Sequence, residues 1–246
     1  MAEYRNGRLQ LPNVTLAAMT SVNIRATVKA LAYSCRGIDF GAVTFICHKK
    51  PHFLPKYIEY QHIDKIDEID KFNYDMIYEM YRYIHTDFCL LVHADGFVVN
   101  PDSWRDEFLD YDYIGSPFPI PPADDHITYR DINGELIRVG NSVSIRSRRL
   151  LEYPAKAGIP FEADHGFFNE DGFICVKNRH RFLAAGMTYA PYEVAKYFGQ
   201  ENHLPDMDGI RPFVFHKWMG PNAEYPNWIP KNHYVKKICD KLDLMD

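Results

Sequence analysis

Asp87-Phe88-Cys89-Leu90-Leu91-Val92-His93-Ala94-Asp95-Gly96-Phe97-Val98-Val99 is the stretch that decides the fold of this chain. Its apolar run, Phe88 to Val92, has the length and composition of a buried strand, and a metal-competent His-x-Asp follows directly. Helices cover the faces of an α/β sheet while the carboxyl ends of its strands open into a crevice. The stretch therefore predicts a sheet protein with its site beside Asp95.

Strand and helix patterns alternate on both sides of this run. The predicted strands are 13–19, 42–47, 57–63 and 88–92, and the predicted helices are 23–35 and 72–84. Alternation of this kind is typical of a mostly parallel sheet with helices on both faces. The first hundred residues are therefore expected to form an α/β fold of the nucleotide-binding, Rossmann-like type.

The second half of the chain has a different pattern of predicted secondary structure. Residues 117–122 are rich in proline, which excludes regular secondary structure there and predicts a loop or flap extending to Asp131. The remaining patterns predict one or two strands over 135–146, helices over 148–153, 173–185 and 190–198, and a short strand over 212–216. No repeat, low-complexity tract or Gly/Ser linker interrupts the sequence, so one domain over 1–246 is expected.

Composition narrows the class of protein. A chain of 246 residues with 46% hydrophobic residues can bury a full core, and a net charge of -5 argues against a nucleic-acid partner. Five cysteines without a C-x-x-C pair favour a reducing, cytoplasmic setting. The amino terminus has no apolar signal core, and no apolar stretch reaches the roughly 18 to 20 residues of a membrane span. The prediction is a cytoplasmic protein, at most peripheral to a membrane.

His93 and Asp95 are candidate metal ligands because residues two apart on an extended chain share a face. The alternative is that His93 caps the strand and Asp95 begins a turn with Gly96. Far downstream, His216 at the end of a short buried strand is a candidate second ligand, and Lys217 could neutralise a phosphate. A structural histidine is the alternative at His216.

Two further motifs carry polar groups next to predicted elements. In Asn169-Glu170-Asp171-Gly172 the two carboxylates precede a helix, whose amino terminus would keep a carboxylate ionised as a base; an ordinary helix cap is the alternative. Val139-Gly140-Asn141-Ser142 is read as a tight turn, with a plain hairpin favoured over a ligand-binding loop.

The order of these motifs is more specific than any one of them. Together the motifs resemble a family of GT-A-type glycosyltransferases over roughly residues 10 to 218; they are His93-Ala94-Asp95-Gly96, Tyr111-Asp112-Tyr113-Ile114-Gly115-Ser116-Pro117, Val139-Gly140-Asn141-Ser142, Asn169-Glu170-Asp171 and Tyr189-Ala190-Pro191-Tyr192-Glu193-Val194-Ala195-Lys196-Tyr197-Phe198. The resemblance implies a GT-A fold with a mixed central sheet, a nucleotide-binding half at 10–100, an acceptor and catalytic half at 101–218, and a tail at 219–246.

The resemblance also implies roles for individual residues. Asp95 and His216 would hold Mn²⁺ or Mg²⁺, and Asp171 with its neighbour Glu170 would supply the base of an inverting transfer. The expected donor-binding residues are Thr20, Ser21, Arg25, Asn73, His93, Ala94, Asp95, Asn141, Ser142 and Lys217. His93 stands where the family's first Asp is usual, and one carboxylate fewer weakens the binding of a hard cation.

The partners implied are a nucleotide-sugar donor, with a UDP-sugar favoured, and a glycan or lipid-linked glycan acceptor. A polysaccharide-building pathway is the family-level expectation. The amphipathic stretch 234–244 carries lysines that suit a peripheral membrane contact, with an ordinary packed helix as the alternative.

Three other functions are alternatives to this interpretation. His93, Asp95 and His216 also fit the two-His-one-carboxylate triad of a non-haem Fe(II)/2-oxoglutarate oxygenase, although the alternating first half does not fit the barrel of such enzymes. The missing first Asp favours a catalytically inactive sugar-nucleotide-binding protein. A metal phosphohydrolase is the third alternative.

Overall fold

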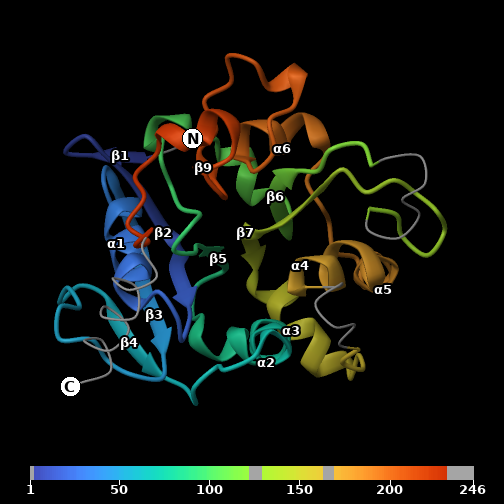
Figure 1. Ribbon diagram of the computed structural model, residues 1–246. Coiled ribbons are helices and arrows are strands. Elements are labelled where there is room, and N and C mark those ends of the chain that lie inside the picture. The colour runs from blue at the N-terminus through green and yellow to red at the C-terminus, as the bar shows by residue number, and fades with distance from the viewer. Residues whose placement is uncertain (1–2, 122–128, 163–168, 232–246) are drawn as a thin grey trace.

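A computed structural model describes residues 3–121, 129–162 and 169–231 of the chain (Figure 1). Its centre is a seven-stranded sheet of order β4-β3-β2-β5-β7-β6, with β1 added alongside β2. The strands are β1 (Glu3–Arg5), β2 (Arg8–Met19), β3 (Ile38–Cys47), β4 (Glu59–His62), β5 (Phe88–Leu91), β6 (Tyr113–Pro117) and β7 (Val139–Ser147). A separate parallel pair is formed by β8 (Gly199–Gln200) and β9 (Val214–Phe215).

The central sheet is mixed. Strands β2, β3, β4 and β5 are parallel, whereas β7 runs antiparallel to both β5 and β6. The predicted α/β class with a mixed central sheet is confirmed. Strands from both halves of the sequence pair in this one sheet, and β5 and β7 join them.

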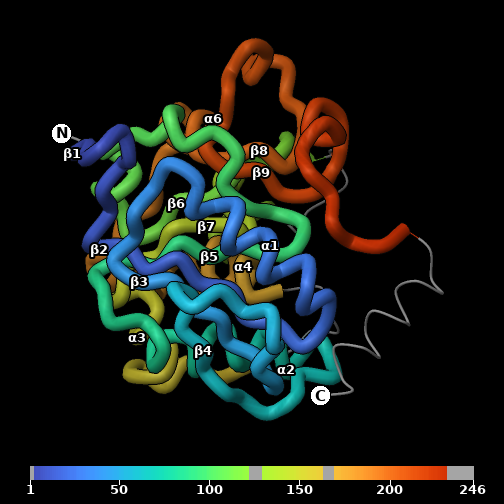
Figure 2. The backbone as a smooth tube through the Cα atoms, turned by 90° about the vertical axis from the view of Figure 1, so that its left-hand side faces the viewer, coloured from blue at the N-terminus to red at the C-terminus, as the bar shows by residue number. Residues whose placement is uncertain are grey.

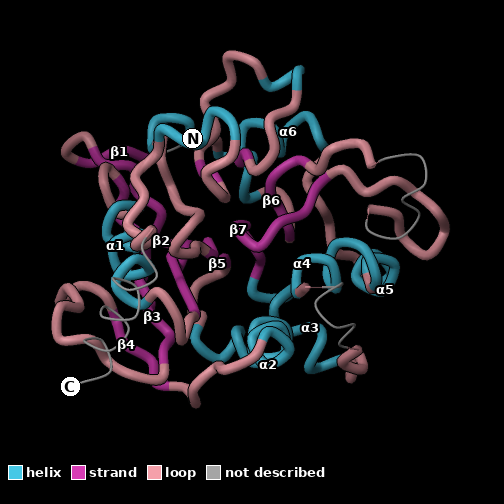
Figure 3. The backbone as a smooth tube through the Cα atoms, in the orientation of Figure 1, coloured by secondary structure: helices cyan, strands magenta, loops and turns pink. Residues whose placement is uncertain are grey.

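Helices lie around the sheet, and Figure 3 shows them against the strands. The helices are α1 (Ile24–Ser34), α2 (Ile69–Tyr74), which continues as a π-helix (Asp75–Glu79) and a 3-10 turn (Met80–Tyr83), α3 (Arg148–Ala157), α4 (Glu170–Gly172), which continues as a π-helix (Phe173–Lys177), α5 (Arg179–Ala184) and α6 (Tyr192–Phe198). Short 3-10 turns occupy Pro101–Ser103, Asp106–Leu109, Pro205–Met207 and Gly220–Glu224.

The two faces of the sheet follow from the alternation of side chains along β2. Leu16 and Ala18 pack in one core with α1, while Ala17 and Met19 pack in another with α2 and its continuation. Both faces are therefore covered, as the near-continuous apolar strands predict. Figure 2, turned by 90°, shows α1 in front of the sheet and α2 below it.

The predicted hairpin at Gly140-Asn141 is wrong, because both residues lie within the continuous strand β7. Glycine serves close approach here rather than a turn: a Cβ on Gly140 would lie 2.1 Å from the Phe118 ring, and one on Gly115 would lie 1.9 Å from the Gly140 carbonyl oxygen. The β6–β7 register shifts at this point. Pro117, placed by the sequence outside regular structure, is the last residue of β6.

Most other predicted elements are confirmed with altered ends. The first strand begins at Arg8 rather than Asn13, and the second helix begins at Ile69 rather than Phe72. Strands β1 and β6 were not predicted. Part of the predicted flap and all of the stretch 234–244 lie outside the described residues. Within the described ranges, no helix has both the length and the apolarity required to traverse a bilayer.

The core on the α1 side supports the central strand, so Leu16→Ala is expected to destabilise the fold. Leu16 is fully buried, and a Leu→Ala change in such a site costs about 2 to 5 kcal/mol of unfolding free energy. Leu183→Ala, at a position that is 47% exposed, is the matched control and should change it by less than about 0.5 kcal/mol. Urea denaturation followed by circular dichroism measures both; equal losses would contradict the placement of Leu16.

Candidate functional site

The candidate site is a cleft at the carboxyl ends of β2 and β5. Its larger part is a cavity of about 370 Å³, lined by Met19, Thr20, Ser21, Val22, Asn23, Thr27, Ile66, Asp67, Glu68, Ile69, Phe72, His93, Ala94 and Asp95. A smaller cavity of about 190 Å³ is lined by Ile69, Phe72, Asn73, His93, Asp95, Ser142, Asn169, Glu170 and His216. Because Ile69, Phe72, His93 and Asp95 line both, the two cavities form one cleft with Asp95 at their junction.

A tight turn after β5 presents Asp95. The backbone N–H of His93 donates to the carbonyl of Gly96 at 2.7 Å, and the N–H of Lys217 donates to the carbonyl of Asp95 at 2.7 Å. The second bond joins segments more than a hundred residues apart and places His216 Nε2 at 3.8 Å from Asp95 Oδ1. A side chain at Gly96 would prevent this, since its Cβ would lie 2.8 Å from His216 Cδ2.

Asp95 and His216 fit two positions around a divalent cation. Two ligands at about 2.1 Å from one ion lie no more than about 4.2 Å apart, so a separation of 3.8 Å allows both to bind it. Among the described residues no group of three or more His, Cys, Asp or Glu side chains has the geometry of a metal site. A cation held by these two residues would take its other ligands from substrate phosphates and water, a common arrangement for Mg²⁺.

Glu201, which the sequence did not single out, lies behind His216. Its side chain is only 13% exposed, and its Oε1 lies 3.6 Å from His216 Nδ1 and 2.5 Å from Lys217 Nζ. Asn141 Nδ2 donates to its other oxygen at 2.5 Å. Burial would raise the pKa of Glu201, but His216 and Lys217 lower it to about 2. Only the pairing of β8, which ends just before Glu201, with β9, which ends just before His216, marks Glu201 as part of the site, and that pairing is a tertiary feature.

Glu170 forms a buried ion pair with Arg146 at 2.8 Å, and both side chains are 0% exposed. Its Oε2 accepts from Ser142 Oγ at 3.1 Å and from the backbone N–H of Asp171 at 2.6 Å. Burial would raise the pKa of Glu170, but the Arg146 guanidinium holds it below its usual value. Both carboxylate oxygens are thus engaged, which suits Glu170 to holding the segment in place rather than to moving a proton.

Asp171 has the opposite character. Burial and the neighbouring Glu170 carboxylate raise the pKa of Asp171 to about 7. Burial and the like charge of Glu170 thus oppose the helix amino terminus, which was expected to keep this group ionised. The charges of Asp95 and Asp171 both act on Lys217: burial would lower the pKa of Lys217, but Glu201 and these two carboxylates raise it.

His93 lines both parts of the cleft, and its Nε2 is buried without a hydrogen-bond partner. Its ring centroid lies 6.0 Å from that of His216 and 6.1 Å from that of Phe72. Burial and His216 lower the pKa of His93 to about 4, so the imidazole is neutral at physiological pH. A neutral ring that faces the cleft can donate or accept one hydrogen bond from a ligand.

The structure brings most of the predicted donor-binding residues to the cleft, at different places. Thr20, Ser21 and Ala94 line the larger cavity, whereas Asn73 and Ser142 line the smaller one. The Thr20 hydroxyl donates to the Val22 carbonyl at 2.6 Å, and the Ser21 hydroxyl accepts from the N–H of Ile66 at 2.9 Å. These two hydroxyls therefore shape the loops around the cavity.

Three predicted donor-binding residues line neither cavity. Arg25 is exposed, with its guanidinium carbon 4.4 Å from the centre of the Phe53 ring. Asn141 is buried behind the site, and the ammonium group of Lys217 is held by Glu201. The prediction placed Arg25 at the phosphates because it follows the first strand closely, but helical geometry turns its side chain outward.

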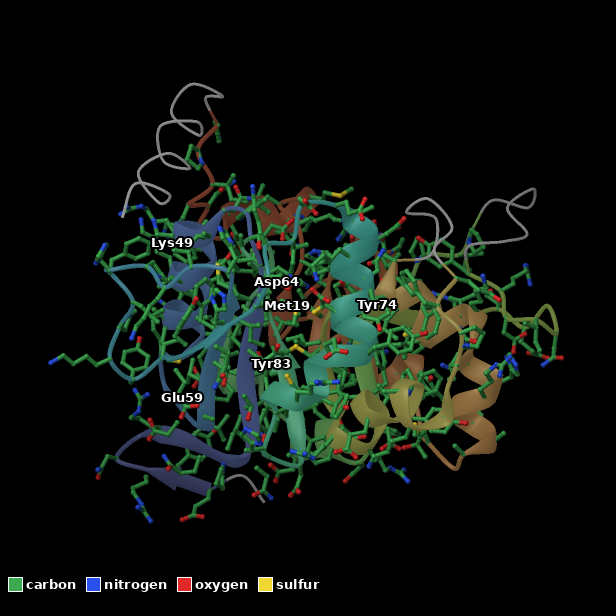
Figure 4. The ribbon with its side chains drawn as sticks, turned by 90° about the horizontal axis from the view of Figure 1, so that it is seen from below. Met19, Lys49, Glu59, Asp64, Tyr74 and Tyr83 are labelled. Atoms are coloured by element: carbon green, nitrogen blue, oxygen red, sulfur yellow. The ribbon has the colours of Figure 1, made fainter. Side chains whose placement is uncertain are left out.

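A separate cavity of about 400 Å³ shares only Met19 with the cleft; its other lining residues are His62, Ile63, Asp64, Lys71, Tyr74, Asp75, Glu79 and Tyr83. Figure 4 shows Met19 and Asp64 beside the α2 helix, from which Tyr74 projects. Lys71 and Asp75 in this cavity already pair with each other at 2.8 Å.

A sequence model of the family described as "Protein of unknown function (DUF5672)" matches residues 56–216. The match covers well over half of the 246 residues and contains Asp95, Asp171, Glu201 and His216. The chain belongs to this family. The DUF5672 match begins after the first three strands and so leaves the Thr20 side of the cleft outside it. No curated protein matches the sequence.

Solved structures show distant likeness only. S. aureus TarS 1-349 has a TM-score of 0.44 at 10% identity, covering 95% of this chain and 66% of that one. The apo-form glycosyltransferase GlyE of Streptococcus pneumoniae TIGR4 has a TM-score of 0.45 at 10% identity, covering 94% and 60%. The bifunctional IspDF of Campylobacter jejuni has a TM-score of 0.43 at 11% identity, covering 72% and 48%. This chain thus spans about half to two thirds of the length of these structures.

The raised pKa of Asp171 predicts a measurable titration. A carboxyl group whose pKa is higher in the folded than in the unfolded state binds its proton more tightly when folded, so its contribution to stability is present at low pH and is lost as pH rises to about 7. We expect a carboxyl resonance with a midpoint near 7 in a ¹³C NMR titration. Asp171→Asn should remove that resonance and flatten the fall in unfolding free energy between about pH 4 and 7.

The matched variant is Glu170→Gln, which removes the like charge and should lower the Asp171 midpoint, because Glu170 is one of the groups that raise it. A midpoint at the ordinary value of about 4 in the wild-type protein would contradict this account of the site.

Proposed function

We propose that this protein is a metal-assisted glycosyltransferase that moves a sugar from a nucleoside-diphosphate donor, with a UDP-sugar favoured, to a glycan or lipid-linked glycan acceptor. The observation that carries the proposal is the approach of His216 to Asp95, the residue at the junction of the two cavities, with Lys217 within electrostatic reach of both Asp95 and Asp171. The fold places this junction at the carboxyl ends of parallel strands, where nucleotide ligands bind in open α/β sheets.

The two cavities suit the two halves of a donor. The larger, bounded by apolar Val22, Ile66 and Phe72, suits a nucleoside, and its carboxylates Asp67 and Glu68 can accept hydrogen bonds from ribose hydroxyls. The diphosphate would then lie beside Asp95, with the sugar and acceptor in the smaller cavity. The positive charge of Lys217, which Glu201 holds, interacts with the carboxylate of Asp95.

Charge explains why a divalent cation belongs in this site. Glu201 is ionised near neutral pH, and a donor diphosphate beside Asp95 adds further negative charge near the Lys217 ammonium. A Mn²⁺ or Mg²⁺ ion held by Asp95 and His216 would offset this charge and stabilise the leaving diphosphate.

The protein's own residues supply the remaining chemistry. Asp171, with a pKa of about 7, can accept a proton from an acceptor hydroxyl near neutral pH, as an inverting transfer requires. Lys217, held by Glu201 and outside both cavity linings, adds positive charge near the oxygens that gain charge as the glycosidic bond breaks. The Glu170–Arg146 pair holds the backbone N–H of Asp171, which follows Asn169 and Glu170 in the lining of the smaller cavity but does not itself line that cavity.

A nucleotide screen tests donor binding. With UDP, GDP, ADP, CDP or TDP at about 100 times its dissociation constant plus Mn²⁺, stabilisation should reach about 2.7 kcal/mol, or a rise in Tm of roughly 5 °C. Asp95→Asn should remove the part of the shift that depends on Mn²⁺, because the amide has lost the charge that binds the ion. Asp102→Asn, at an exposed position remote from the cleft, should keep the full shift. No shift with any nucleotide would refute the proposal.

Turnover tests the role of Asp171. Release of nucleoside diphosphate from the selected sugar nucleotide in the presence of acceptor should fall by about 10² to 10⁴ in Asp171→Asn, while the thermal shift with nucleotide and Mn²⁺ stays at its wild-type size. In the wild-type protein kcat should fall as pH drops below about 7, because the base becomes protonated. Equal rates in wild type and variant would exclude Asp171 as the base.

The same assays separate the other activities. Nucleotide release at full rate without acceptor would indicate a phosphohydrolase, and binding without turnover would indicate a non-catalytic sugar-nucleotide-binding protein. An oxygenase is disfavoured because His93, Asp95 and His216 do not form a three-ligand group among the residues that the structure describes. Its test is the formation of succinate from 2-oxoglutarate with Fe²⁺.

A further inference from the structure

The buried carboxylate of Glu201 stands directly behind the imidazole of His216, on the side away from Asp95. Oε1 of Glu201 lies 3.6 Å from His216 Nδ1, whereas His216 Nε2 lies 3.8 Å from Asp95 Oδ1. His216 Nδ1 is buried and has no hydrogen-bond partner among the described residues. The imidazole therefore lies between two carboxylates, one on each nitrogen.

The register of β8 and β9 builds this arrangement. Gln200, the last residue of β8, pairs with Phe215, the last residue of β9. The residues that follow the two strands, Glu201 and His216, therefore lie side by side. The N–H of His216 donates to the Gln200 carbonyl at 3.0 Å. Buried Asn222 fastens the pair of strands, since its Nδ2 donates to the Gln200 carbonyl at 3.0 Å and to the Lys217 carbonyl at 3.2 Å.

Asn141 fixes the carboxylate from the opposite side. It holds φ of 102°, which is unfavourable for a residue with a side chain, and in this conformation its Nδ2 reaches Glu201 Oε2 at 2.5 Å. Its own Oδ1 accepts from the N–H of Val143 at 3.0 Å. A strained asparagine whose amide nitrogen and oxygen are both hydrogen-bonded, and which anchors a buried carboxylate, indicates that the position of Glu201 matters to the site.

We propose that Glu201 is a positioning residue, which keeps the proton of His216 on Nδ1 and so leaves the Nε2 lone pair directed at Asp95 and at the cation between them. The part of this proposal that concerns the metal rests on the function proposed above. The part that concerns the tautomer of His216 does not. A carboxylate on the far nitrogen of a metal-binding histidine fixes its tautomer and orientation and makes it a stronger ligand. The 3.6 Å separation is longer than a hydrogen bond, and binding of a cation at Nε2 makes Nδ1–H a stronger donor toward Oε1.

The same carboxylate also keeps Lys217 beside the cleft. Lys217 Nζ lies 2.5 Å from Glu201 Oε1. The backbone of Lys217 has a φ of 64°. One buried side chain thus sets the position of a proposed metal ligand and of the Lys217 ammonium beside it. Loss of Glu201 is expected to affect cation affinity and diphosphate binding together.

The direct test is the tautomer of His216 in the metal-free full-length protein. In ¹⁵N NMR spectra at a pH where the ring is neutral, His216 should carry its proton on Nδ1 in the wild type. Glu201→Ala should shift the population toward the Nε2–H form, and Glu201→Gln, which retains an acceptor oxygen, should keep more of the Nδ1–H form. A wild-type ring protonated on Nε2 would overturn the proposal.

The second test is Mn²⁺ affinity, titrated by electron paramagnetic resonance in the presence of the nucleotide chosen by the thermal-shift screen. Removal of an outer carboxylate of this kind typically weakens metal binding by about 10- to 100-fold, and we expect that loss in Glu201→Ala with a smaller one in Glu201→Gln. Glu193→Ala removes an exposed carboxylate that pairs with Lys196 and should leave the affinity unchanged. Wild-type affinity in Glu201→Ala would overturn the role assigned to Glu201.

The two tests distinguish this proposal from the proposed function. If the wild-type protein binds no Mn²⁺ with any nucleotide, the metal-assisted transferase is refuted, and the tautomer of His216 still decides whether Glu201 positions the ring. Should Glu201→Ala fail to fold, Asn141→Gly tests the same network: glycine adopts the positive φ without strain, the bond to Glu201 is lost, and the same direction of change in tautomer and affinity is expected.

Discussion

The buried ion pair between Arg146 and Glu170 is the interaction on which the site depends. It joins β7 to α4 across the interior, with neither side chain exposed to solvent. Two charges taken out of water are stable only when well paired, so loss of either partner would leave an uncompensated charge and cost about 3 to 5 kcal/mol. Ser142 and Asn73 add bonds from β7 and α2 to the same residue, so the acidic segment is held from both sides.

This ion pair also gives the adjacent carboxylates of Glu170 and Asp171 different pKa values. Glu170 takes the Arg146 charge and stays ionised, and its negative charge then raises the pKa of Asp171. Two neighbouring residues of similar chemistry thereby acquire opposite properties, one as a fixed anchor and one as a group that titrates near neutrality. Such separation of pKa values by environment is how proteins assign acid and base roles to like side chains.

The other side of the cleft depends on chain segments that meet only through backbone bonds. The N–H of Lys217 on the Asp95 carbonyl, and β9 beside residues 97–99, bring His216 to the end of β5. Gly96 leaves the space that the His216 ring occupies. The residue types of Asp95 and His216 make each of them a candidate ligand. The two side chains come close together only because the β9 segment packs against the segment that follows β5.

Local patterns were sufficient for the α/β class, for the buried strand β5 that precedes His93-Ala94-Asp95, and for the positions of α1 and the α2 helix. They failed at Gly140-Asn141, where glycine permits close contact between strands rather than a turn, and they did not foresee that Arg25 lines neither cavity and lies over the Phe53 ring. The reason is that periodicity reports which faces of an element are apolar but not which distant segment packs against them. A conformation such as φ of 102° at Asn141 is likewise set by tertiary contacts.

By itself the sequence determined the alternating strands and helices, the carboxylates available at the ends of β5 and before the Phe173 helix, and the candidacy of His216. Only the tertiary structure decided that Glu170 is an anchor, that the pKa of Asp171 is raised, and that Glu201 stands behind His216. The physical reason is that ionisation and ligand geometry depend on desolvation and on charges a few ångströms away, and both are set by residues remote in the chain.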